Sequence, residues 1–168
     1  MRRPILPVRE FRSERPTADN GHFMITHFSV DSVTESLRQE GLRITKNRRG
    51  ILECLFAARE PMSLQEIQDS ALMFSGTKPD YATVFRMILL MEKLHLVHKV
   101  NLQRPCSYYE LRDPHKHYDH LICKKCAHVV LIDIPCPIGD TEQKLAKKYG
   151  FTDLSHSLEF FGTCSQCV

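Results

Sequence analysis

The chain has 168 residues, and its 23 Lys and Arg against 20 Asp and Glu give a formal net charge of +3. With 42% hydrophobic and 26% charged residues and no run of eighteen apolar positions, the sequence excludes a transmembrane span and a wholly disordered chain. The first residues lack the apolar run and the small-residue cleavage site of a secretory signal, so we expect a reducing, cytoplasmic location. In that compartment, seven cysteines favour metal or redox chemistry over disulfides.

The N-terminal two thirds of the chain predict a flexible arm followed by four helices. Residues 1–30 are rich in Arg, Pro and Thr without periodicity, which is typical of a flexible basic arm. Each helix is indicated by apolar side chains at three- and four-residue spacing and by a capping or terminating residue. The four predicted helices run from Asp31 to a stop at Gly41, from the Thr45 cap to a point before Pro61, from the Ser63 and Glu66 capping box to about Phe74, and from the Asp80 cap through Leu94.

A predicted β-hairpin follows the fourth helix. Its strands are Leu96–Asn101 and Ser107–Leu111, and Arg104 lies at the tip between them. Helices in this order with such a hairpin are typical of a winged helix-turn-helix domain. In that domain, the second helix of the pair enters the major groove of DNA.

The remaining residues differ in composition and predict a second, smaller domain. Strands are expected at 121–122, 129–134 and 155–161, with a helix over 140–149, which together indicate a small α/β unit. We therefore predict an α+β fold in four segments. These are the arm at 1–30, a winged-helix DNA-binding domain at 31–111, a His-rich hinge at 112–120 and the small C-terminal domain at 121–168.

Two C-x-x-C pairs in the C-terminal segment predict a structural zinc site. Cys123 and Cys126 form one pair, Cys164 and Cys167 form the other, and 37 residues separate the two pairs. Four thiolates complete the tetrahedral shell of one Zn²⁺, which leaves no position open for catalysis. The alternatives are a dithiol redox site or two unrelated reduced pairs.

A second group of candidate metal ligands surrounds the hinge. It consists of Glu110, His115, His117, Asp119 and His120, whose nitrogen and oxygen donors suit Fe²⁺, Mn²⁺ or Zn²⁺. Such donors exchange a metal more readily than four thiolates do, so this group is a candidate for sensing a metal. The alternative is a set of hydrogen-bonded histidines in a polar loop.

Over about residues 33–167, five segments in order resemble the ferric uptake regulator family of metal-responsive bacterial repressors. They are Gly41–Leu52, similar to the second-helix signature; Ser63–Ile67, similar to the third helix; Ala82–Arg86, similar to the recognition helix with Phe85 in place of the usual Tyr; and His120–Cys126 with His156–Cys167, similar to the two halves of the zinc-bearing dimerisation domain. The resemblance implies a homodimer whose C-terminal domains associate and whose winged helices bind two halves of an AT-rich palindrome in double-stranded DNA.

The resemblance also assigns side chains to the DNA interface. Tyr81, Thr83, Phe85 and Arg86 are expected to face the groove or the backbone, and Arg43, Arg48, Arg49 and Arg104 to neutralise phosphates. Phe85 keeps the ring for contact with a thymine methyl group but lacks the tyrosine hydroxyl. The alternatives are a core position for Phe85 and a solvated helix face for the basic patch near the second helix.

The predicted regulatory site departs from the family pattern at several ligand positions. Glu60-Pro61-Met62 replaces a segment that carries a His, Tyr118 occupies a His position, and Leu131 occupies a carboxylate position, with Asp133 two residues later on the same strand face. The matching ligands are Glu110 and, for an additional metal site, His117, Asp119 and His156. The sensing site is therefore either rebuilt around these residues or lost.

We predict a dimeric, metal-responsive transcription regulator, a repressor of metal-homeostasis or oxidative-stress genes, that carries structural Zn²⁺ and a regulatory Fe²⁺, Mn²⁺ or Zn²⁺. An alternative within the family is a peroxide sensor that oxidises a His beside bound Fe²⁺. An alternative from a different class is a zinc ribbon that binds only proteins. No membrane partner is expected, and no enzyme, because the sequence lacks a His-x-Glu beside a C-x-x-C.

Overall fold

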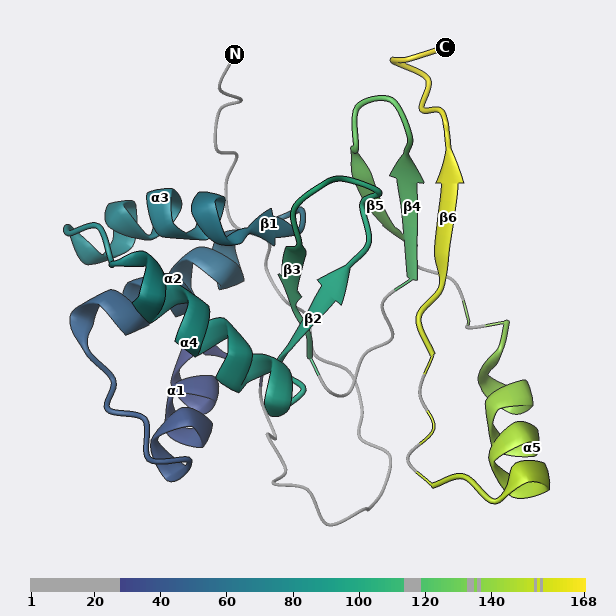
Figure 1. Cartoon of the computed structure of the whole chain (residues 1–168), viewed down its shortest axis with the longest axis horizontal. Coiled ribbons are helices and arrows are strands. Elements are labelled where there is room, and N and C mark those ends of the chain that lie inside the picture. The colour runs from purple at the N-terminus through teal and green to yellow at the C-terminus, as the bar shows by residue number, and fades with distance from the viewer. Residues whose placement is uncertain (1–27, 114–118, 133–134, 136, 153, 155) are drawn as a thin grey trace.

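The computed structural model describes residues 28–113, 119–132, 135, 137–152, 154 and 156–168. The predicted arm before Phe28, and the candidate ligands His115, His117 and Asp133, lie outside these residues. Figure 1 shows the helices of residues 30–93 on one side of the chain, the strands in the middle and the helix of residues 139–149 on the other side. Among the helices that the structure describes, none has both the length and the hydrophobicity of a membrane span.

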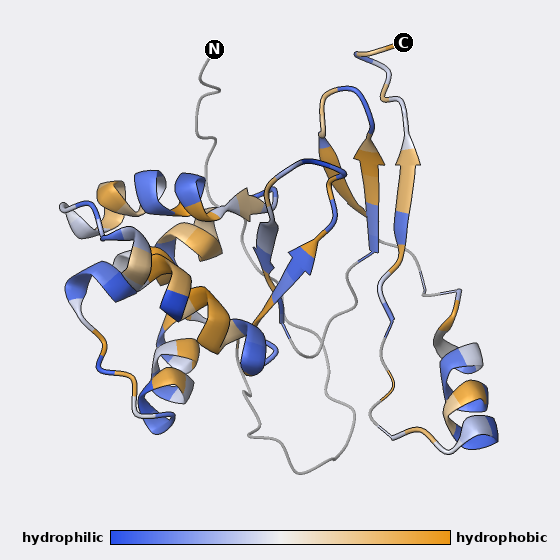
Figure 2. Cartoon of the chain, in the orientation of Figure 1, coloured by the Kyte–Doolittle hydropathy of each residue, from blue (hydrophilic) through white to orange (hydrophobic). Residues whose placement is uncertain are grey.

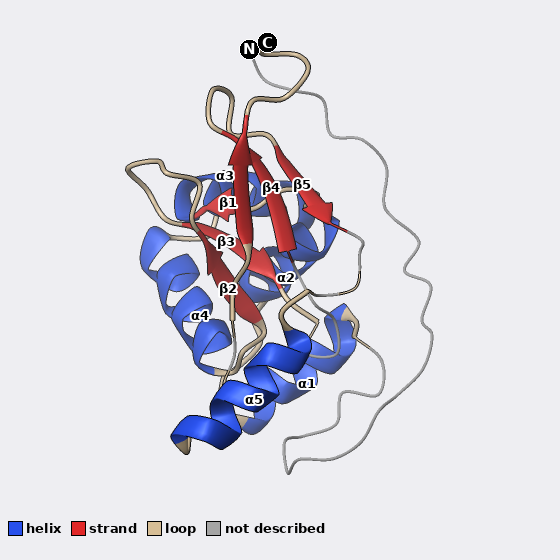
Figure 3. Cartoon of the chain, turned by 90° about the vertical axis from the view of Figure 1, so that its right-hand side faces the viewer, coloured by secondary structure: helices blue, strands red, loops and turns tan. Residues whose placement is uncertain are grey.

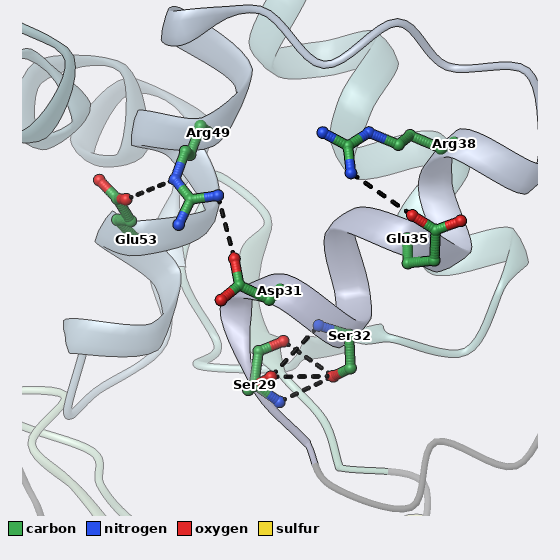
Figure 4. Close-up of polar contacts among 7 residues, drawn as sticks. All are labelled: Ser29, Asp31, Ser32, Glu35, Arg38, Arg49 and Glu53. Carbon is green, nitrogen blue, oxygen red and sulfur yellow. Dashed lines mark hydrogen bonds and ion pairs between the residues drawn. The ribbon is translucent and has the colours of Figure 1, made fainter.

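All four predicted N-terminal helices are present. They are α1 (Val30–Gln39), α2 (Lys46–Ala57), α3 (Leu64–Ser75) and α4 (Tyr81–Lys93). The predicted caps of α2, α3 and α4 are confirmed, because Thr45, Ser63 and Asp80 each accept a hydrogen bond from a backbone N–H in the first turn. The sequence analysis missed the cap of α1, where Ser29 and Ser32 form a reciprocal capping box (Figure 4).

The four helices enclose one apolar core. Each helix contributes to it the row of apolar side chains that their three- and four-residue spacing predicts. The fully buried side chains of the core include Leu37, Ile51, Ile67, Met87 and Ile88. Helices α2 and α3 approach closely at Gly50, where an added Cβ would lie 2.7 Å from the Cβ of Ser75. This contact needs glycine because the Ser75 backbone N is also only 3.0 Å from that position.

The predicted hairpin is the wing of the helical domain. Strands β2 (Val97–Val100) and β3 (Tyr108–Leu111) are antiparallel, and a two-residue strand β1 (Met62–Ser63) pairs with the other edge of β3. The sheet order is therefore β1-β3-β2. Strand β1 was not predicted, because two residues are too short to give a sequence pattern.

The C-terminal sheet has the order β5-β4-β6. Its strands are β4 (Asp119–Cys123), β5 (Val129–Ile132) and β6 (Glu159–Gly162), with β5 antiparallel and β6 parallel to β4. The helix α5 (Gly139–Tyr149) ends at Gly150, which adopts the left-handed conformation. Two predicted limits were wrong. Strand β4 begins at Asp119, inside the predicted hinge, and β6 begins at Glu159 rather than at 155, because it pairs only with His120 to Cys123.

One face of the C-terminal sheet packs against the predicted hairpin. On this face, Ile122, Val129 and Phe161 pack with Val100, Leu102 and Tyr108 of the hairpin and form a second apolar cluster. The two sheets therefore lie side by side, as Figures 1 and 3 show. Figure 2 shows β4 as hydrophilic at its start and strongly hydrophobic over the rest of the strand, and α5 as alternating between hydrophilic and hydrophobic turns.

Candidate metal centres and DNA-facing surface

The four cysteines of the predicted zinc site come together at one end of the C-terminal sheet. Cys123 ends β4, and the parallel register places it opposite Gly162 at the end of β6, so the turns after both strands meet. The four Sγ atoms lie within 4.8 Å of one another, and the Sγ atoms of Cys126 and Cys164 are 3.8 Å apart. Tetrahedral Zn–S bonds of about 2.3 Å separate the sulfur atoms by about 3.8 Å, so the cluster fits Zn²⁺.

Hydrogen bonds around the cysteine cluster prepare it for a cation. The backbone N–H groups of Cys126 and Cys164 lower the pKa of Cys123 to about 6, so this sulfur is a thiolate at neutral pH. Hydrogen bonds with the side chains of Cys164 and Cys126 raise the pKa of Cys167 to about 12. The Cys164 N–H to Cys123 Sγ distance is 3.4 Å. A thiolate is the form that binds zinc, and the ion itself supplies the charge that favours the remaining thiolates.

A second cluster of potential ligands lies between the two sheets and contains His98, Glu110 and His120. One ligand atom from each of the three side chains lies within 4.8 Å of the others. His120 Nε2 is 2.7 Å from Glu110 Oε2, and the His98 and His120 rings stack with centroids 5.8 Å apart. Burial lowers the pKa of His98 to about 4, so its imidazole is neutral at neutral pH.

The sequence analysis included two of these residues and missed the third. His98 comes from β2, and its Cα pairs with that of Glu110 in the hairpin, a register that only the strand pairing reveals. The available signal was the position of His98 inside the predicted strand Leu96–Asn101. Leu131 lies opposite His120 in β5, where a carboxylate would adjoin the cluster but leucine offers no ligand atom.

Two of the other predicted regulatory ligands, Asp119 and His156, are described by the structure and are not part of this cluster. His156 Nδ1 lies 3.0 Å from Glu142 Oε2, which ties the segment before β6 to α5. Asp119 is buried at the start of β4, and it is not among the clustered ligands of the described residues. The predicted site around Glu110, His117, Asp119 and His156 includes His117, which lies outside the described residues, so this grouping stays a prediction.

The outward side of α4 carries the side chains predicted to face DNA. Tyr81 and Phe85 are 50% and 43% exposed, so Phe85 is not a core residue. Arg86 is exposed beside them. Thr83 is half-buried, and its hydroxyl donates to the Asp80 carboxylate. Val84, Met87 and Met91 occupy the opposite side of α4, in the core.

The arginines that were predicted to contact phosphates differ in the interactions of their side chains. Arg43 and Arg104 are exposed, and the Arg48 guanidinium donates to the Arg43 carbonyl group. Arg49 instead lies between two carboxylates, 3.1 Å from Asp31 and 3.0 Å from Glu53, and so links α1 to α2 (Figure 4). Those two carboxylates raise the pKa of Arg49 and compensate its charge.

These elements define a winged-helix protein with a second, sheet-containing unit that carries a four-cysteine cluster. The chain belongs to the ferric uptake regulator family, whose family model matches residues 39–161. It is 31% identical over 136 residues to the ferric uptake regulation protein of Campylobacter jejuni. The aligned region covers 78% of this chain and 83% of that protein.

Two further relatives agree with this assignment. The chain is 33% identical over 132 residues to the zinc uptake regulation protein of Mycobacterium tuberculosis. The aligned region covers 76% of this chain and 95% of that protein. The crystal structure of the ferric uptake regulator of Vibrio cholerae superposes with a TM-score of 0.60 at 28% identity, over 79% of this chain and 99% of that one. The relatives are thus named for different metals.

Proposed function

We propose that this chain is a metal-responsive transcription regulator that binds double-stranded DNA as a homodimer. The observation that carries the proposal is the outward side of α4, where Tyr81, Phe85 and Arg86 are exposed on a helix whose other side is in the core. Arginine recognises guanine or phosphate, and an aromatic ring suits a thymine methyl group. We assign base contacts to Phe85 and Arg86 on this ground.

Phosphate contacts are proposed for the basic side chains around α4. Arg43 and Arg48 lie near the start of α2, and Arg104 lies at the tip of the wing. Such contacts position a protein on DNA and make its affinity depend on salt. We leave Arg49 out of this set, because its two carboxylate partners already compensate its charge.

A second copy of the chain is the proposed partner of the C-terminal sheet. Val130, Leu121 and Phe160 are direct neighbours across β5, β4 and β6, and they are 45%, 49% and 43% exposed. They face away from the cluster that Ile122 forms with the hairpin, since side chains alternate along a strand. Helix α5 carries two further exposed apolar side chains, Leu145 and Tyr149. Such an apolar surface is typical of an interface in an oligomer.

A structural zinc ion is assigned to Cys123, Cys126, Cys164 and Cys167. When bound, the ion supplies a closed tetrahedral shell and cross-links the turns after β4 and β6. Lys125 Nζ donates to the Cys167 carbonyl group over 2.7 Å and holds the same two turns together. The sheet that carries the proposed dimer surface therefore depends on this centre.

Selection of duplexes from a randomised DNA pool tests the proposal. The expected result is enrichment of a palindrome whose affinity rises when Fe²⁺, Mn²⁺ or Zn²⁺ is added. Arg86→Ala should weaken binding by about tenfold or more, whereas Arg38→Ala, an exposed α1 arginine paired with Glu35, should leave it unchanged. A pool that shows no enrichment at low salt would support the protein-interaction alternative, and equal affinities with and without metal would reject the metal response.

A further inference from the structure

One carboxylate, that of Asp80, organises the first turn of the helix α4. Asp80 is the N-cap of α4, and its Oδ1 accepts a hydrogen bond of 2.8 Å from the backbone N–H of Thr83. Its Oδ2 accepts a second hydrogen bond, of 2.6 Å, from the Thr83 hydroxyl. Asp80 therefore fixes both the start of the helix and the direction of the Thr83 hydroxyl proton.

The direction of the second hydrogen bond determines what the Thr83 oxygen can still bind. Hydrogen bonds from the Thr83 hydroxyl and backbone lower the pKa of Asp80, so the carboxylate is ionised at neutral pH and can only accept. A hydroxyl has one proton and two lone pairs, and Thr83 uses its proton in the bond to Asp80. The Thr83 oxygen can thus accept a hydrogen bond from a further group but cannot donate one.

The Asp80 and Thr83 side chains lie where a ligand can reach them. Asp80 is exposed and Thr83 is half-buried. They line a hollow of about 450 Å³ between the first turns of α2 and α4, together with Thr45, Lys46, Asn47 and Arg48. In helix-turn-helix proteins, the N-terminal residues of the recognition helix contact the base edges. The first turn of α4 therefore presents oxygen atoms that only accept hydrogen bonds at the place where a base edge is expected.

We propose that Thr83, oriented by Asp80, selects adenine or cytosine at one position of the DNA half-site. This inference rests on the proposed DNA-binding function. In the major groove, adenine and cytosine present an amino group as a donor, whereas the O4 of thymine and the O6 of guanine are acceptors. An oxygen that can only accept binds the amino groups and repels the two carbonyl oxygens. Thr83 contacts the base, and Asp80 is a positioning residue that acts through Thr83.

Arg86 indicates where in the half-site this position lies. Thr83 and Arg86 are three residues apart, which is about 4.5 Å along the helix axis and close to the rise of about 3.4 Å between neighbouring base pairs. Arginine donates to guanine or to phosphate, whereas Thr83 accepts. The two side chains therefore present opposite hydrogen-bonding character to neighbouring positions of the DNA.

Binding to the duplex enriched from the randomised pool tests the inference, with all four bases placed in turn at each half-site position. At one position, the wild-type chain should prefer adenine or cytosine by about three- to tenfold, the size of one hydrogen bond. Thr83→Val removes the hydroxyl and should abolish the preference at that position alone.

Asp80→Asn should shift the preference at the same position toward thymine or guanine. The amide group of asparagine can donate to the Thr83 oxygen, which releases the hydroxyl proton for a bond to DNA. Asparagine caps helices about as well as aspartate, so the start of α4 is retained. A residue that only supported the helix would change the affinity for all duplexes and leave the base preference as it is.

Asp69→Asn is the matched control, because Asp69 is an exposed carboxylate of α3, paired with Lys78, and the variant loses the same charge away from α4. The loss of this charge should change the affinity for all duplexes by the same factor and leave the base preference unchanged. Thermal unfolding checks that each variant is folded, and Thr83→Ala replaces Thr83→Val if the latter unfolds.

Three results would overturn the inference. They are a wild-type preference for thymine or guanine at the position that Thr83→Val affects, the absence of any affected position, and an unchanged base preference in folded Asp80→Asn. Each of these results leaves DNA binding intact. A wild-type chain that enriches no duplex would contradict the proposed function instead.

Discussion

Gly50 of α2 lies so close to Ser75 of α3 that a Cβ added to Gly50 would be 2.7 Å from the Ser75 Cβ. Gly50→Ala should therefore force the two helices apart and reduce the free energy of unfolding by about 1–3 kcal/mol. Urea unfolding followed by circular dichroism measures this loss. Gly162→Ala is the control, because a Cβ there meets nothing within 4 Å, and its effect should stay within about 0.5 kcal/mol. Equal stability of the two variants would contradict the close approach of α2 and α3.

Two cysteines outside the metal cluster should differ strongly in reactivity. Burial raises the pKa of Cys54 to about 11, whereas Cys106 is exposed in the wing. An alkylating reagent at neutral pH should therefore modify Cys106 quickly and Cys54 only when the fold opens, since the thiolate is the reacting form. Peptide mass spectrometry after short exposures gives both rates.

The same shift has a consequence for stability at alkaline pH. The folded pKa of Cys54 is higher than its ordinary value of 9.0, so the folded chain retains the proton more strongly than the unfolded chain. The contribution to stability is complete below pH 9 and is lost as the pH rises through about 11. Cys54→Ala should remove this part of the alkaline decline, and Cys106→Ser should not.

The exposed apolar row on the C-terminal sheet predicts the oligomeric state. Leu121→Lys places a charge at the centre of the row, between Val130 and Phe160, and should shift the protein from dimer to monomer at micromolar concentration. Analytical ultracentrifugation measures the change. Leu72→Lys is the matched control, since Leu72 of α3 is 43% exposed, close to the 49% of Leu121, but belongs to the helical domain. A dimer that survives Leu121→Lys would place the interface elsewhere.

The cysteine cluster should support the C-terminal sheet rather than the helices. Cys126→Ser is expected to lower the zinc content and to increase amide hydrogen exchange in β4 and β6, because both strands end at the cluster. Exchange in α2 and α3 should change little, since their core is separate. Cys106→Ser serves as the control. Unchanged zinc content in Cys126→Ser would remove this residue from the site.

Local signals in the sequence were sufficient for the helices and the cysteine cluster. Thr45, Ser63 and Asp80 cap helices through bonds to residues three positions away, so the sequence contains the whole interaction. The C-x-x-C spacing is similarly local. The parallel pairing of β4 with β6, which brings the two cysteine pairs together, is not local and was not predicted. The sequence predicted only that one zinc ion joins the two pairs.

The features that the sequence did not predict depend on contacts between distant residues. His98 approaches His120 only because two sheets pack together, and Arg49 meets Asp31 only because α1 crosses α2. The start of β4 at Asp119 depends on its neighbours β5 and β6 rather than on its own composition. The spacing of residues within one segment cannot predict such contacts between distant segments.

The wing has no interior of its own. Val97 and Tyr109 belong to the core of the helices, whereas Val100, Leu102 and Tyr108 belong to the cluster shared with the C-terminal sheet. The hairpin thus packs against the helices near its base and against the C-terminal sheet farther along its strands. Arg104 is exposed at its tip. A tilt of the C-terminal sheet must either carry this tip with it or expose apolar side chains to water, which costs about 25 cal/mol for each Å².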